Sequence, residues 1–191
     1  ARVPIVPGAV IFDLALGDPR VRPGAAMGYA ACEDASARAW RQGNVGAGMG
    51  ASVGKVLGMA HASKGGLGMA SLRAGDLVVA ALAVVNAWGD VIDPAAGAIL
   101  AGARDPAGQG FLDTARALRG GDLAPGQRPS AFTNTVIGVV ATNARLDAAR
   151  ANELAAAAHD GLARAVRPAH TLYDGDAFFA LAMGEVQAEF V

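Results

Sequence analysis

Hydrophobic residues along the chain recur with two different periods, and these divide it into strand-like and helix-like segments. Residues 64–94 hold two apolar runs on either side of a polar Arg-Ala-Gly-Asp turn. We expect two antiparallel strands there, the second ending at Asn86. The short valine-rich run 136–141, directly after Thr135, predicts a buried strand. The stretch 170–184 predicts a tight acidic turn followed by a further strand.

Apolar residues spaced three and four positions apart predict the helices. The clearest helix covers 146–168, where Asp147 is a capping residue and Pro168 ends the pattern. The segment 111–120 predicts a short helix. The segment 25–40 also has helical spacing, and we expect one face of it to lie inward, formed by Met27, Ala30, Ala31, Ala35 and Trp40.

Strands joined by hairpins, with helices elsewhere along the chain, favour an α+β fold with a layered sheet core. The 191 residues fit one domain, 1–191, which is long enough to bury a substantial core. Sixteen basic and seventeen acidic residues give a net charge of −1, and the basic residues are scattered along the chain. This balance gives no electrostatic basis for binding nucleic acid or an anionic membrane.

The apolar runs bear on the compartment of the protein, whereas the single cysteine says little about it. The longest apolar run, 77–85, is too short to span a membrane, and the N-terminus lacks the pattern of a signal peptide. These two features favour a cytoplasmic location of the protein. Cys32 has no second cysteine with which to form a disulfide, and we expect a small buried side chain there rather than a nucleophile.

The glycine-rich segment 43–55 invites comparison with a phosphate-binding loop. That loop would need glycine at position 49 and serine or threonine at position 56, whereas Met49 and Val56 stand there. The segment does end in Lys55, at the entry to apolar sequence. Since lysine is seldom buried without a partner, the ordinary alternative for Lys55 is an exposed side chain.

The histidines give no sign of a metal centre. None of them has the spacing of zinc ligands, and no second cysteine is present. His159 lies close to the apolar stripe of the predicted helix, where a structural role is expected. The three histidines are His61, His159 and His170.

Thr135 stands where a loop rich in glycine and proline meets the buried strand. At such a place a chain can be cut and a new N-terminus held rigidly. A free N-terminal threonine supplies both a nucleophile and a base, because its α-amine, with a pKa of about 7.7–8.0, can accept the hydroxyl proton. The ordinary alternative is a threonine that simply begins a strand.

Four other residues fit this chemistry. Asn86, at the end of a strand, can donate to an oxyanion, and a charged Lys55 can keep the amine neutral. Asp174 and Asp176 lie around a glycine in the acidic turn, where they can orient the amine. Their ordinary alternative is a solvent-exposed hairpin turn. Together with Thr135, these residues predict cleavage of amide bonds through an acyl-enzyme that needs no metal or organic cofactor.

Five segments of the chain together resemble the DmpA-type peptidases. This L-aminopeptidase/D-esterase family also includes nylon-oligomer hydrolases and β-peptidyl aminopeptidases. The segments are VPIVPGAVIFDL, GNVGAGMGASVGKV, NTVIGVVATNARL, AHDGLARAVRPAHT and YDGDAFFALAMG. They follow in order through almost the whole chain, and NTVIGVV and DGD are the most specific parts. Members are made as inactive precursors that cleave themselves into a larger and a smaller subunit.

The resemblance implies a cut between Asn134 and Thr135, with Thr135 as the nucleophile. Residues 1–134 would then belong to the larger subunit and residues 135–191 to the smaller one. The other site residues that it implies are Lys55, Asn86, Asp174 and Asp176. The implied fold is an αββα sandwich like that of N-terminal-nucleophile hydrolases, usually assembled as a homotetramer.

The chain also departs from the family pattern. Members are longer at both ends, so we expect a domain that lacks N-terminal and C-terminal parts, including a region with an active-site tyrosine. Asp174 stands where serine-type members have serine, which indicates the threonine-type branch. Two alternatives stay open: an acyltransferase that uses an amino-acid acceptor, and a non-catalytic relative that binds a small ligand. The expected partner of the hydrolase is a small peptide or amide.

Overall fold

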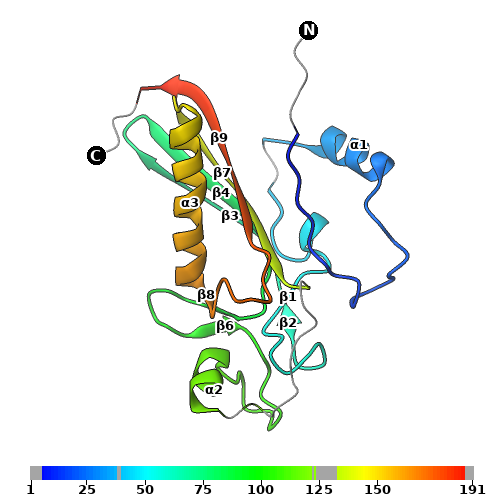
Figure 1. Cartoon of the computed structure of the whole chain (residues 1–191). Helices are drawn as coiled ribbons and strands as arrows, with labels where there is room; N and C mark the ends of the chain where they lie inside the picture. Colours follow the sequence, from blue (N-terminus) through cyan, green and yellow to red (C-terminus); the bar gives the residue numbers. More distant parts are fainter. Residues whose placement is uncertain (1–5, 38–39, 122, 124–132, 188–191) are drawn as a thin grey trace.

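The structure, a computed structural model, describes residues 6–37, 40–121, 123 and 133–187. Its largest element is a four-stranded sheet with the order β3-β4-β7-β9 (Figure 1). Strands β3 to β7 of this sheet are antiparallel, whereas β7 and β9 are parallel and are connected through helix α3. The bounds are β3 Gly66–Ala74, β4 Leu77–Asn86, β7 Thr135–Ala144, α3 Ala148–Ala165 and β9 Ala177–Val186.

The predicted strands and the long helix are confirmed, and local chemistry explains their ends. Gly75, with φ of 58°, turns the chain between β3 and β4. Asp147 caps α3 by accepting a hydrogen bond from the backbone N–H of Arg150 at 2.8 Å. The helix ends three residues before Pro168, as its sequence predicts.

Helix α3 covers one face of the large sheet. Its Leu162 packs with Val136 of β7 in the main buried cluster, together with Val53, Ala87 and Val166. Alternate residues of β7, from Val136 to Ala144, are buried in this layer, and the residues between them are half-buried on the opposite face. Within the described ranges, no second large sheet packs on that opposite face.

Two small sheets and a short helix lie beyond the end of the large sheet where β7 begins. The small sheets pair β1 (Ser52–Val53) with β2 (Ser63–Lys64), and β5 (Asp90–Ile92) with β6 (Ile99–Ala101) and β8 (Val166–Arg167). The single-turn helix η1 is Gly46–Gly48, and α2 is Thr114–Gly120. The buried carboxylate of Asp90 ties β5 to α2 by accepting from the N–H and the hydroxyl of Thr114.

Helix α1 (Ala25–Asp34) corrects two predictions. It forms within the predicted segment 25–40, but none of its residues is buried, and Met27 and Trp40 are 53% and 61% exposed. Cys32 is exposed as well, so the prediction of a buried cysteine is wrong. The physical reason is that this alanine-rich helix has only a weak apolar stripe, and it lies apart from the sheet (Figure 1).

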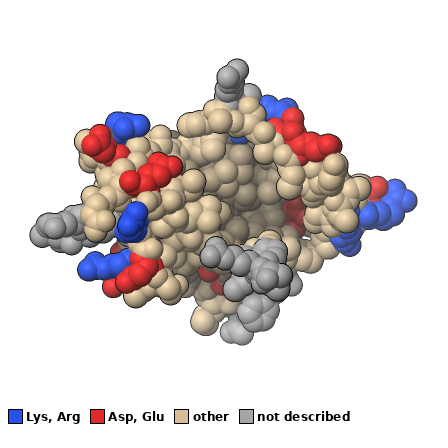
Figure 2. All heavy atoms as spheres, turned by 90° about the horizontal axis from the view of Figure 1, so that it is seen from above, with Lys and Arg blue, Asp and Glu red and all other residues tan. Residues whose placement is uncertain are grey.

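The surface seen from above is hollowed between the part that carries the sheet and the part that carries α1 (Figure 2). Charged side chains in this view lie mainly toward the outside, and uncharged atoms line most of the hollow. Among the helices in the described ranges, none is both long enough and apolar enough to cross a membrane.

Candidate active site

Segments that are distant in the sequence meet at one end of the large sheet. Because β4 and β7 are antiparallel, the last residue of β4, Asn86, pairs with the first residue of β7, Thr135. Asn134 forms a parallel bridge with Asp174, just ahead of β9. The segment after β1 brings Lys55 against Asn86. These five residues, and Asp176, which binds the N–H of Val136, are the six that sequence analysis assigned to catalysis or self-cleavage, and they lie in one region.

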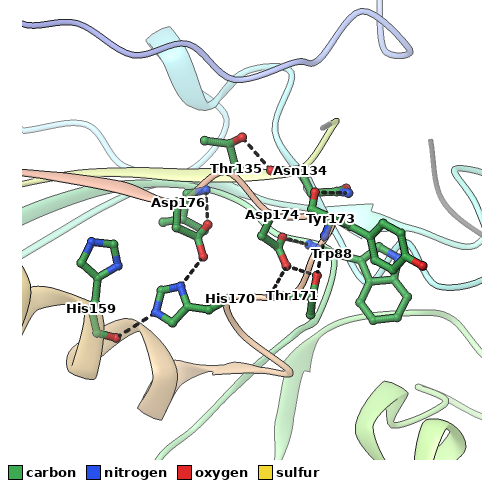
Figure 3. A network of polar contacts seen from close by, with 10 residues as sticks. Trp88, Asn134, Thr135, His159, His170, Thr171, Tyr173, Asp174 and Asp176 are labelled. Carbon is green, nitrogen blue, oxygen red and sulfur yellow. Dashed lines mark hydrogen bonds and ion pairs between the residues drawn. The ribbon is translucent and has the colours of Figure 1, made fainter. Parts of the chain in front are cut away.

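The peptide bond between Asn134 and Thr135 is held through its carbonyl oxygen (Figure 3). That oxygen accepts a hydrogen bond from the backbone N–H of Gly175 at 2.8 Å and another from Thr135 Oγ1 at 2.6 Å. The Asn134 side chain is fully buried, and its Nδ2 donates to the carbonyl of Tyr173 at 3.1 Å. The threonine hydroxyl thus lies beside the carbonyl group that precedes it, and a backbone donor already faces the oxygen on which negative charge would develop.

Asn86 is fully buried and has four hydrogen-bond partners. Its Oδ1 accepts from the N–H of Ser52 at 3.1 Å and from Lys55 Nζ at 2.8 Å. Its Nδ2 donates to the carbonyl oxygens of Phe12 and Thr133, both at 3.3 Å. Both protons of the amide are therefore occupied while the chain is continuous. Nδ2 becomes available to another acceptor only when one of these two carbonyl groups moves.

Lys55 is buried, with 8% of the residue exposed, so the alternative of an ordinary exposed lysine is wrong. Its Nζ donates to the backbone oxygen of Asn86 at 3.2 Å and to Oδ1 of the same residue at 2.8 Å. Burial lowers the pKa of Lys55 to about 8, against the opposing influence of the Asp174 carboxylate. The charge of this lysine therefore changes within a pH range where enzymes work.

The two aspartates of the acidic turn have different partners. Asp174 accepts hydrogen bonds from the N–H of Trp88 and from both the N–H and the hydroxyl of Thr171, so it braces the turn. Asp176 accepts from the N–H of Val136, the residue after the predicted nucleophile, at 2.8 Å. Only 4% of the Asp176 side chain is exposed, and burial raises its pKa. The alternative of a solvent-exposed side chain in a hairpin turn is therefore wrong for Asp176.

Sequence analysis missed two residues of this region. His170 places Nδ1 2.8 Å from Asp176 Oδ2, although its spacing was weighed only as that of a metal ligand. Gly175 was interpreted only as a turn residue, yet its N–H binds the carbonyl of Asn134. The available signal was closeness in sequence, because both residues belong to the loop that carries the acidic pair.

Two buried polar atoms near the Asn134–Thr135 bond have no hydrogen-bond partner among the described residues. They are Asn134 Oδ1 and Trp88 Nε1. The Trp88 ring packs against Tyr173, with ring centres 5.4 Å apart, and the carbonyl of Tyr173 binds Asn134. A buried polar atom without a partner costs free energy, so each of these two atoms calls for an explanation.

A cavity that is widely open to solvent, with a volume of about 440 Å³, adjoins the region from the side of β1 and β2. Ser52 connects the two places, because it lines the cavity and its N–H binds Asn86. The volume falls in the usual range for small-molecule sites. The lining residues are Leu16, Ser52, Met59, Ala62, Ser63, Lys64 and Arg104.

Known proteins resemble the chain over nearly its full length. An uncharacterized aminopeptidase of Mycobacterium tuberculosis (strain ATCC 25618 / H37Rv) is 48% identical over 190 residues, which are 96% of this chain and 52% of that protein. A 6-aminohexanoate-oligomer endohydrolase of Kocuria sp. (strain KY2) is 32% identical over 194 residues, 97% of this chain and 52% of that protein. The chain thus spans about half the length of these curated relatives.

Two solved structures share the fold. The beta-aminopeptidase of a Burkholderia species aligns with a TM-score of 0.54 at 25% identity, covering 88% of this chain and 42% of that chain. The L-aminopeptidase D-Ala-esterase/amidase of Ochrobactrum anthropi, described as a variant of the Ntn hydrolase fold, aligns with a TM-score of 0.53 at 22% identity, covering 87% and 40%. These likenesses confirm the predicted α+β fold of the N-terminal-nucleophile type. A family model described as peptidase family S58 matches residues 1–189, so the predicted resemblance is confirmed and the chain belongs to peptidase family S58.

Proposed function

We propose that the protein is a self-processing amide hydrolase of the N-terminal-nucleophile type, with Thr135 as nucleophile and small peptides or amides as substrates. The observation that carries the proposal is that the Asn134 carbonyl oxygen accepts hydrogen bonds from both the Thr135 hydroxyl and the N–H of Gly175. The names of the two relatives, an aminopeptidase and an oligomer endohydrolase, support the same class of reaction.

Self-cleavage starts when Thr135 Oγ1 attacks the carbonyl carbon of Asn134 and gives up its proton, which passes to the leaving nitrogen of Thr135. The C–N bond then breaks, its nitrogen takes up that proton, and Asn134 is left as an ester on Oγ1 beside a free α-amine. Water hydrolyses the ester, which yields residues 1–134 with a terminal carboxylate and residues 135–191 beginning with Thr135. The N–H of Gly175 stabilises the oxyanion in both steps.

In the cut enzyme, the α-amine of Thr135 accepts the hydroxyl proton as Oγ1 attacks the substrate amide. The amine product leaves with that proton, and water then releases the acyl group as an acid. Once the carbonyl of Thr133 has moved away, Nδ2 of Asn86 donates to the substrate oxyanion. Lys55 keeps the α-amine neutral through its positive charge.

The two aspartates and the cavity complete the proposed site. Asp176 orients the Thr135 end of the strand through the Val136 N–H, and Asp174 holds the turn that presents Asp176. The cavity beside Ser52 receives the substrate, and its volume falls in the range of sites that bind small molecules.

Mass spectrometry of the intact purified protein, combined with N-terminal sequencing, tests the proposal. We expect two fragments whose masses add up to the uncut chain plus one water, the smaller beginning Thr-Val-Ile-Gly. Thr135→Ser should still cut, because serine keeps the hydroxyl, whereas Thr135→Ala should give a single chain. A parent protein that stays uncut, or a Thr135→Ala protein that yields the same two fragments, contradicts the proposal.

Two further expectations from the sequence, on the oligomeric state and on the cellular location, belong to the same proposal. A homotetramer, as the family resemblance implies, would be recognised by light scattering of the purified protein. A cytoplasmic location would be recognised by fractionation of the cells that make it.

A further inference from the structure

His170 contacts the site from a position that none of the proposed steps uses. Its Nδ1 lies 2.8 Å from Asp176 Oδ2, and its Nε2 lies 3.4 Å from the carbonyl oxygen of His159 on α3. Asp176 in turn accepts the N–H of Val136 at 2.8 Å through Oδ1. A series of contacts therefore leads from α3 to the residue that follows Thr135 (Figure 3).

The contact between His170 and Asp176 fixes the buried carboxylate at both of its oxygens. A separation of 2.8 Å between Nδ1 and Oδ2 requires a proton between them, because two lone pairs at that distance would repel. The other oxygen, Oδ1, is bound by the Val136 N–H. With 4% of its side chain exposed, Asp176 has little water to replace either partner.

The backbone of His170 gives an independent indication. Its φ is 53°, in the left-handed region that residues with a Cβ rarely adopt. The turn that follows is braced, since the N–H and hydroxyl of Thr171 both donate to Asp174. Strained conformations persist where the surrounding structure requires them, and they concentrate at functional sites. Here the strained backbone turns the imidazole toward Asp176.

We propose that His170 is a positioning residue for the nucleophile. By holding Asp176, it fixes the N–H of Val136, and through the strand it fixes Thr135 against the carbonyl of Asn134. This inference rests on the proposed function, because it assigns His170 to the step in which Thr135 attacks. His170 itself does not touch the reacting atoms.

Two substitutions at His170 and one matched control separate positioning from simple packing. His170→Gly removes the ring and relieves the left-handed backbone, so the loss of the contact is not accompanied by added strain. His170→Asn keeps an N–H donor close to the place of Nδ1, and asparagine tolerates the left-handed region. The control, His61→Asn, removes another histidine whose Nδ1 contacts a carbonyl oxygen, that of Arg104 at 3.2 Å.

We expect His170→Gly to slow self-cleavage about 10- to 100-fold in protein that is still folded, because small misplacements of a nucleophile cost that much. His170→Asn should restore most of the rate, and His61→Asn should cut like the parent. In the mature enzyme the loss should fall on kcat, with KM nearly unchanged. The inference is overturned if His170→Gly cuts at the parent rate, if His170→Asn restores nothing, or if the control loses as much.

A spectroscopic measurement keeps this test separate from the proposed function. The Val136 N–H donates to a carboxylate, so its proton resonance should lie downfield and move upfield in His170→Gly but not in His61→Asn. The comparison is made in Thr135→Ala protein, where every chain is uncut. If the parent chain is never cut, the proposed function fails, and the Val136 resonance still decides whether His170 holds Asp176. An unmoved resonance in His170→Gly overturns the inference.

Discussion

At the scale of single residues, Gly175 lies where any side chain would press on the nucleophile. A Cβ built on Gly175 would be 3.1 Å from Thr135 Oγ1 and 3.9 Å from the carbonyl oxygen of Asn134. The first distance is shorter than ordinary van der Waals contact, so the hydroxyl would have to shift. The absence of a side chain at Gly175 therefore leaves room for the Thr135 hydroxyl beside the Asn134 carbonyl group.

Gly175→Ala should slow self-cleavage about 10-fold or more, because it displaces Oγ1 from the carbonyl that the hydroxyl attacks. Stability should change little, since Gly175 is exposed. The measurement is the time course of fragment formation by mass spectrometry. Gly161→Ala is the matched control, because Gly161 is an exposed residue of α3 whose added Cβ would meet nothing within 4 Å. Equal rates of cutting in the two variants would contradict this interpretation of Gly175.

The buried Lys55 leads to a prediction about pH. With the pKa of Lys55 near 8, kcat/KM of the mature enzyme should rise as the α-amine of Thr135 loses its proton and fall as Lys55 loses its own. The decline follows because a neutral lysine no longer polarises the Asn86 amide, whose Oδ1 it binds and whose Nδ2 is the proposed donor to the oxyanion. Lys55→Arg keeps the charge at all working pH values and should remove the decline on the alkaline side. A decline that persists unchanged in Lys55→Arg would assign it to another group.

At the scale of elements, the sequence pattern predicted those parts whose burial is set along the strand or helix itself. The strand that follows Thr135 and the Asp147 cap of α3 are examples, and both are confirmed; in the strand, β7, every second residue is buried. Helix α1 lies where the spacing predicted a helix, but the face that was predicted to lie inward is not buried. Helical spacing indicates which residues share a face, whereas burial of that face depends on whether another element covers it.

The glycine that interrupts β7 shows how neighbouring strands fit together. Gly138 is paired with Phe178 of β9, and a Cβ on Gly138 would lie 2.2 Å from a ring carbon of that phenylalanine. Gly138→Ala should therefore destabilise the protein by about 1–3 kcal/mol through overpacking, measured by denaturant unfolding. Phe178→Leu in the same chain should recover part of the loss, because leucine is smaller. Equal unfolding midpoints for the parent and Gly138→Ala would contradict this account of the glycine.

At the scale of the whole molecule, the candidate site depends on contacts that cross most of the chain. Lys55 and Asn86 are 31 positions apart, and Asn86 binds the carbonyl of Phe12 across 74 positions. Residue types and strand ends were enough to propose Thr135, Asn86 and Lys55 from the sequence. The occupied donors of Asn86 and the different partners of the two aspartates were not predictable, because they arise only when separate segments pack together.

The burial of Lys55 should also make the stability of the whole fold depend on pH. Its pKa of about 8 in the folded state is below its ordinary value of 10.5, so the unfolded chain binds more protons between these pH values. The free energy of unfolding should therefore rise with pH through this window, by about 3 kcal/mol at most. Lys55→Met removes the titrating group and with it this rise.

Denaturant unfolding of the two proteins from pH 7 to pH 10 measures this contribution, with Thr135→Ala present in both so that neither chain is cut. Groups that titrate in both proteins cancel in the difference between their unfolding free energies. That difference should favour Lys55→Met most below pH 8, where the parent must bury a charged ammonium, and it should shift toward the parent as pH rises. A constant difference across the range would mean that Lys55 keeps its ordinary pKa in the folded protein, and the alkaline decline in activity would then need another cause.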